Sequence, residues 1–184
     1  MIARDSLVVG RVQSPLPDWK PPMALHLASQ RDIEAQTVAP YALDLPRGTP
    51  VMTMQGVMPV EHLLPGDRVI TRAGAVPLVA VAALPPAPVA IVRVSARALG
   101  HDRPAEDICL PADQPILIRD WRAKALFGQL EAVVPLSRLI DGAYVQAAPV
   151  ATLPLIRLGL PRATVVQAAG LELATPALEV PAGA

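Results

Sequence analysis

The sequence predicts an all-β domain built from short strands, and three observations support this fold class. Proline is abundant, with 22 residues, and each proline removes a backbone donor and interrupts helices. The segments between the prolines are short and rich in β-branched residues, which favour strands. Apolar residues make up 52% of the chain but aromatic residues only 3%, so Val, Leu, Ile and Ala must fill the core.

The pattern along the chain places the expected elements. Two brief helical turns are predicted at residues 60–64 and 135–140, and each is stopped by a Gly-containing pair, Pro-Gly or Asp-Gly. Residues 121–130 fit either a helix or a wide hairpin. Strands are expected at five apolar runs, which are residues 69–71, 78–81, 89–94, 116–118 and 165–166.

Composition divides the chain into three parts. Residues 1–40 are polar and interrupted by proline, which is typical of an arm or linker that packs poorly. Residues 41–175 contain the strand-like runs and form the expected domain. Residues 176–184 are expected to be a C-terminal tail.

Charge and cysteine content exclude several function classes. Sixteen basic and sixteen acidic residues cancel, so the basic excess typical of nucleic-acid binding is absent. A single cysteine excludes an intramolecular disulfide. The first apolar run, residues 7–9, is too short for a signal peptide, and no stretch is long enough for a membrane helix. We expect a cytoplasmic protein without a membrane partner; export by a non-classical route and an unidentified protein partner stay open.

The most informative stretch runs from Leu45 to Thr71. It reads L-P-R-G-T-P-V-M-T, then Gly56, then V-E-H-L-L-P-G-D-R-V-I-T. These residues predict a strand, a glycine turn, a second strand, one helical turn and a tight turn into a third strand. The Pro-Gly pair suits a type II turn, and the side chain of Asp67 is expected to stabilise that turn.

This stretch resembles the opening block of Hint (hedgehog/intein) domains, which contains a G-T pair, a T-x-x-G hairpin and V-E-x-L-x-x-G-D-x-V. Three later blocks, in the same order, resemble the bacterial Hint-type subgroup. They are residues 110–117, like the strand with T-P-x-H or S-P-x-H, residues 134–142, like V-P-A-x-x-L-V-x-G, and residues 157–171, like the closing strand pair. The resemblance covers about Asp44 to Leu173 and implies a curled, horseshoe-like all-β fold with pseudo-two-fold symmetry.

The resemblance also implies a self-cleavage site. In the family, a Cys or Ser attacks the preceding carbonyl to form a (thio)ester, and a Thr and a His assist this step. Asp44 stands at the nucleophile position, where attack by its carboxylate would form an anhydride more reactive than the amide. Pro111 stands at the Thr position without a hydroxyl, and Gln114 stands at the His position without a titratable group.

The closing block departs from the family in the same way. Ala163 and Thr164 stand where the family has a His-Asp pair, and Arg157 stands at an earlier His. We therefore expect a Hint-like domain without enzymatic activity, acting as a structural or interaction module, in which Asp44, Pro111, Gln114 and Ala163 mark a former site. One alternative is self-cleavage near Asp44 by an N-to-O/S acyl shift that uses other groups. Another is an unrelated small-molecule-binding β-barrel.

The other reactive side chains suggest no further site. Cys109 lies between Ile108 and Leu110 and is expected to be buried in the core. Glu61 is expected to face solvent, and Trp121, if exposed, is a candidate contact residue. No metal or other cofactor is expected, because metal-ligand spacing is absent among the three histidines, His26, His62 and His101.

Overall fold

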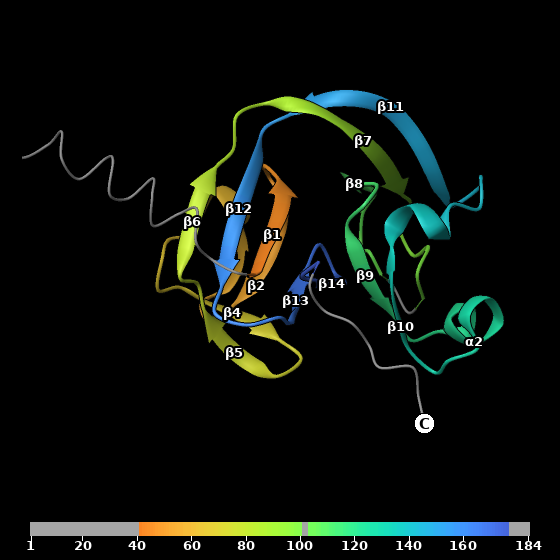
Figure 1. Ribbon diagram of the computed structural model, residues 1–184, viewed down its shortest axis with the longest axis horizontal. Helices are drawn as coiled ribbons and strands as arrows, with labels where there is room; N and C mark the ends of the chain where they lie inside the picture. The colour runs from red at the N-terminus through yellow and green to blue at the C-terminus, as the bar shows by residue number, and fades with distance from the viewer. Residues whose placement is uncertain (1–40, 101–102, 177–184) are drawn as a thin grey trace, which may run out of the picture.

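The structure, a computed structural model, describes residues 41–100 and 103–176 of the chain (Figure 1). These residues form fourteen β-strands, one short α-helix and two 3-10 turns, so the predicted all-β fold class is confirmed. The predicted arm at residues 1–40 lies outside the described residues, as does the predicted tail beyond Pro176. Among the described residues, no helix is both long and apolar enough to cross a membrane.

The elements follow one another through short connections. The first half of the chain contains β1 (Tyr41–Pro46), β2 (Pro50–Thr53), β3 (Gly56–Pro59), the 3-10 turn η1 (Val60–His62), β4 (Arg68–Thr71), β5 (Gly74–Pro77), β6 (Ala80–Ala83) and β7 (Ala87–Val94). The second half contains β8 (Ile108–Pro111), β9 (Pro115–Ile118), α2 (Trp121–Phe127), β10 (Ala132–Pro135), η2 (Leu136–Leu139), β11 (Val145–Leu153), β12 (Leu155–Leu160), β13 (Val165–Ala168) and β14 (Leu171–Ala174).

Most of the predicted elements are present. Both helical turns exist as η1 and η2, and four of the five strand runs lie within β4, β7, β9 and β13. The run at residues 78–81 is only half strand, because the amide of Leu78 donates to Asp67 O of the preceding turn instead of joining β6. For residues 121–130, the sequence fitted either a helix or a wide hairpin, and the structure has a helix there. Asp120 caps its start, and Gly128, in the left-handed conformation, ends it.

The strands form three sheets. Sheet A has the order β1-β12-β6, sheet C has the order β11-β7-β8, and sheet B has the main path β10-β9-β14-β13-β2-β4-β5, with β3 paired to β2. Figure 1 shows β7 and β11 as a long antiparallel pair that arches from the side of β6 and β12 to the side of β8. The chain therefore curls around a shared interior, as a horseshoe does, whereas its pseudo-two-fold symmetry stays a prediction.

Leucine and valine fill the core, as the composition predicts. The largest fully buried side chains are Leu43, Leu45, Leu63, Leu110, Ile116, Leu136, Leu158, Leu160, Leu173, Val51, Val60 and Val69. None of them is aromatic; Phe127 only packs against the core, while Trp121 and Tyr144 are exposed. Because side chains alternate along a strand, burying Leu43 and Leu45 turns Asp44 between them to the opposite face of β1.

Two hairpins use the same side-chain device. In the β2–β3 hairpin, Thr53 Oγ1 donates to Gly56 O over 2.8 Å and accepts from the amide two residues on. In the β4–β5 hairpin, Thr71 Oγ1 makes the equivalent bond to Gly74 O over 2.6 Å. Both glycines have positive φ, 110° and 99°, which side chains disfavour. Each T-x-x-G segment thus sets its own turn.

Two acidic side chains stabilise the neighbouring turns. Asp67 Oδ2 accepts from the amide of Leu64 over 2.8 Å, which confirms the predicted role of Asp67. The side chain of Glu61, predicted to face solvent, is partly exposed, at 19%, and Glu61 Oε2 accepts from the amide of Gly48. That backbone hydrogen bond holds the pKa of Glu61 below its usual value.

Candidate functional site

A cavity of about 770 Å³ brings most of the predicted site positions together. Asp44, Pro111 and Gln114 line it, together with Arg157. Ala163 does not belong to its lining and lies half-buried in the loop between β12 and β13. The lining also includes Tyr41, Ala42, Pro88, Val89, Ala90, Ala112, Asp113, Pro115, Leu155 and Pro176. We call this cavity the cleft.

An ion pair between Asp44 and Arg157 occupies one wall of the cleft. The two residues are direct partners in the antiparallel register of β1 and β12. Arg157 Nε donates to Asp44 Oδ1 and Arg157 Nη2 donates to Asp44 Oδ2, both over 2.7 Å. This bidentate geometry is the one in which guanidinium and carboxylate fit best. The hydrogen bonds that Arg157 donates to Asp44 raise the pKa of Arg157, although desolvation acts against them.

Gln114 is fixed in the turn between β8 and β9. Its amide donates to Pro111 O over 3.1 Å, which closes the turn. Its side chain is buried, and Nε2 donates both to Pro115 O at 2.8 Å and to Ala174 O at 3.1 Å. Two carbonyl acceptors require a donor between them, so the side-chain oxygen Oε1 is left as the free acceptor.

The remaining positions carry little chemistry. Pro111 is buried at the end of β8 and offers neither a hydroxyl nor an N–H. Asp113 is exposed at the cleft, and within the described ranges its carboxylate makes no hydrogen bond or ion pair. In the closing block, the amide of Thr164 donates to Thr175 Oγ1, so Thr164 has a structural role in pairing the two strand ends.

The composition of the cleft limits the reactions it can support. Among the described residues that line it, none is Cys, Ser, Thr or His. An acyl shift needs a nucleophile and a group that exchanges protons near neutral pH, and imidazole is the side chain whose ordinary pKa suits that role. The cleft instead offers carboxylates, a guanidinium, an amide and the phenol of Tyr41. These groups suit recognition by hydrogen bonds and charge.

The structure corrects the prediction for Cys109 and places the other candidates. Cys109 is exposed rather than buried, because side chains alternate along β8 and Cys109 lies on the same face of sheet C as its exposed cross-strand partner Arg93. His62 is exposed, whereas His26 and His101 lie outside the described residues. In residues 41–100 and 103–176, no three potential ligands converge to hold a metal ion. Trp121 is 70% exposed on α2, and Arg122 lies 5.1 Å above its ring.

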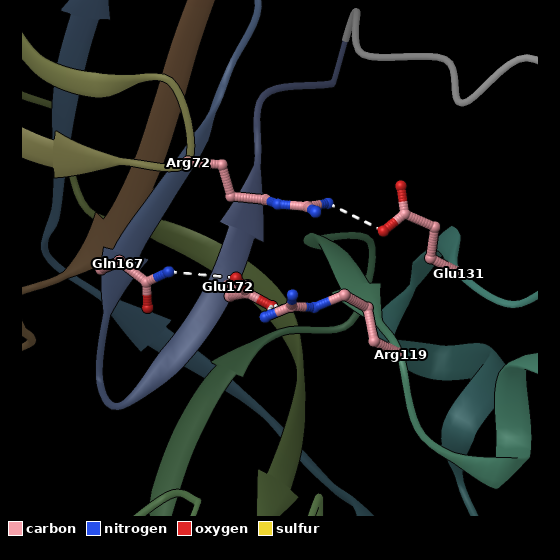
Figure 2. A network of polar contacts seen from close by, with 5 residues as sticks. All are labelled: Arg72, Arg119, Glu131, Gln167 and Glu172. Carbon is pink, nitrogen blue, oxygen red and sulfur yellow. Dashed lines mark hydrogen bonds and ion pairs between the residues drawn. The ribbon is translucent and has the colours of Figure 1, made fainter.

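A second polar group, missed by the sequence analysis, lies apart from the cleft (Figure 2). Glu172 on β14 is only 7% exposed, and its carboxylate accepts from Arg119, which follows β9, and from Gln167 on β13. Nearby, Arg72 donates to Glu131 over 2.9 Å. The contact of Arg72 with Glu131 and that of Arg119 with Glu172 each join residues more than fifty positions apart in sequence. Local spacing therefore gave no signal for either contact. The hydrogen bonds of Glu172 connect β14 to β13 and to the residue that follows β9.

A model of the Hint domain matches residues 45–176, most of the chain. The chain belongs to the Hint domain family. Because the match is to this family, the alternative of an unrelated small-molecule-binding β-barrel is not supported.

Solved structures of inteins are similar to this Hint domain. The crystal structure of gp41-1 intein is 11% identical with a TM-score of 0.40, and the match covers 71% of this chain and 95% of that one. The crystal structure of MchDnaB-1 intein is 16% identical with a TM-score of 0.43, and the match covers 71% and 98% respectively. A search of curated proteins finds no match.

Proposed function

We propose that this Hint domain does not cleave itself and acts as a structural or interaction module of the bacterial Hint-type subgroup. The observation that carries the proposal is the bidentate Asp44–Arg157 ion pair. It occupies the positions where the resemblance expects a nucleophile and a histidine. A carboxylate is a weak nucleophile toward an amide, and its two hydrogen bonds to a guanidinium oppose such an attack further.

Another part of the cleft wall supports the same proposal. Gln114 stands at the expected histidine position, and its Nε2 is already engaged by two backbone carbonyls. An amide does not exchange protons near neutral pH, so it cannot shuttle a proton between nucleophile and leaving group. With Pro111 beside it, this wall lacks the hydroxyl that would help to polarise the scissile bond.

The mass of the purified full-length chain tests the proposal. We expect one species of full mass, unchanged after incubation with a thiol or with hydroxylamine, which would trap any (thio)ester. Asp44→Ala should behave identically, as should the control Glu106→Ala, which removes an exposed carboxylate that does not line the cleft.

Fragments from cleavage beside Asp44 or Leu45 would support the alternative of self-cleavage. The decisive result would be nucleophile-induced cleavage that disappears in Asp44→Ala and persists in Glu106→Ala. That pattern would show that Asp44 takes part in an acyl shift and would overturn the proposal.

A further inference from the structure

We infer that the cleft binds a basic side chain, Arg or Lys, carried on an extended peptide segment of a partner protein. The inference rests on the proposed function, because an uncleaved chain keeps the cleft intact. Three features of the cleft carry it: its size, its excess of acceptors over donors, and the unpaired strand edges beside it.

The cleft has a net negative lining. Its charged residues are Asp44, Asp113 and Arg157, and Asp44 and Arg157 neutralise each other through their bidentate pair. The carboxylate of Asp113 is left over, with no ion-pair partner in the part of the chain that the structure describes. A cationic ligand would complete this charge balance, whereas an anionic ligand would meet an uncompensated carboxylate.

The hydrogen-bonding groups of the cleft point to the same ligand. Gln114 is 5% exposed and lines the cleft, and both of its side-chain donors are spent on backbone carbonyls. Its Oε1 is therefore an acceptor without a donor among the described residues. Four lining residues have no N–H to offer, namely Pro88, Pro111, Pro115 and Pro176. A guanidinium or ammonium group, which only donates, fits such an acceptor-rich lining.

Strand edges beside the cleft favour a peptide over a small cation. β1 is an edge strand of sheet A, and its residues Tyr41, Ala42 and Asp44 line the cleft. β7 pairs with β8 from Ile91 onward, and the amide of Ala112 continues this pairing by donating to Ala90 O over 2.8 Å. Of the β7 residues that line the cleft, residues 88 and 89 therefore have no strand on that side within the described ranges. An extended segment can hydrogen-bond to such edges while one of its side chains enters the cavity. The volume of about 770 Å³ admits a long side chain with its flanking backbone.

Three labelled pentapeptides test the inference against the full-length chain. The probes are fluorescein-labelled Ala-Val-Arg-Val-Ala and its counterparts with citrulline or glutamate in place of arginine, measured by fluorescence anisotropy. Citrulline keeps the shape of arginine and removes its charge. We expect the arginine peptide to bind, the citrulline peptide to bind about tenfold more weakly, and the glutamate peptide not to bind. Binding of the arginine peptide should weaken as salt is added.

Variants of the chain assign the binding to the cleft. Asp113→Asn should weaken binding of the arginine peptide about tenfold, and this exposed residue can change without disturbing the fold. The control Glu106→Gln removes an exposed carboxylate elsewhere and should leave binding unchanged. No binding, equal binding of the three peptides, or an Asp113→Asn variant that binds as the parent does would each overturn the inference. The intact mass of the same sample reports separately on the proposed function.

Discussion

The hairpin turns and the cleft use polar side chains in opposite ways. In the turns, Thr53 and Thr71 bond to backbone groups two or three residues away, and Asp67 bonds to an amide three residues away. In the cleft, Asp44 bonds to Arg157, which is 113 residues away in sequence, and both side chains remain partly open to solvent. The side chains in the turns fix the local backbone conformation. The ion pair in the cleft instead joins two strands that already pair through their backbones.

On β1, the residues that stabilise the fold are therefore different from the residue that faces the cleft. The backbone of β1 is held by its register with β12 and by the burial of Leu43 and Leu45 on its inner face. The residue between them can therefore change from one polar side chain to another with little effect on the sheet.

The largest expected effect comes from the inner face of β1. Leu43 is fully buried, so Leu43→Ala should lower the free energy of unfolding by about 3 kcal/mol, since it removes apolar contacts and leaves a cavity. Urea denaturation of the full-length chain measures this change. Met54→Ala, at a side chain 61% exposed, is the control and should change stability by less than about 0.5 kcal/mol. A Leu43→Ala variant as stable as the parent would contradict the view that the buried face of β1 holds the strand in place.

The two hairpins should give the next largest effects. Thr53→Val and Thr71→Val keep the side-chain shape but remove a buried hydroxyl and its hydrogen bonds, so each should cost about 1–2 kcal/mol. Because the two turns are built alike, the two losses should be similar. Thr152→Val, at an exposed position on β11, is the matched control. Losses that differ between the hairpins by more than about 2 kcal/mol would show that the turns are not equivalent.

A third turn should make stability depend on acid. Asp141 Oδ1 accepts from the amides of Val145, Ala143 and Tyr144, and these bonds hold the pKa of Asp141 below its ordinary value. Its ionised form thus stabilises the fold above the ordinary pKa, and this contribution is lost as pH falls through the lowered pKa.

Unfolding curves between about pH 3 and pH 7 measure that loss. Asp141→Asn keeps one side-chain oxygen but cannot titrate, so its stability should change less with pH than that of the parent and be lower at neutral pH. The control Asp113→Asn should keep the acid-dependent loss of the parent, because the carboxylate of Asp113 makes no hydrogen bond or ion pair within the described ranges. Equal pH dependence of the parent and Asp141→Asn would sink this prediction.

The same contrast explains what could be predicted from the sequence. Short-range signals placed η1, η2, most of the strands and the role of Asp67, because each depends on residues a few positions apart. The family resemblance singled out Asp44, Pro111 and Gln114, and all three line one cleft. The pairing of Asp44 with Arg157, the burial of Glu172 and the exposure of Cys109 depend on strand register and on which sheet face is covered, which local patterns do not encode.

The smallest expected effect is that of the ion pair itself. A double-mutant cycle of Asp44→Asn and Arg157→Gln should give a coupling free energy of only about 0.5–1 kcal/mol, because solvent screens both partly exposed side chains. Urea denaturation of the four proteins measures it, and the coupling should fall as salt is added. A coupling above about 3 kcal/mol would mean that the cleft pair supports the fold as the core does. A weak coupling would instead show that the pair lies in the cleft without being needed to hold β1 against β12.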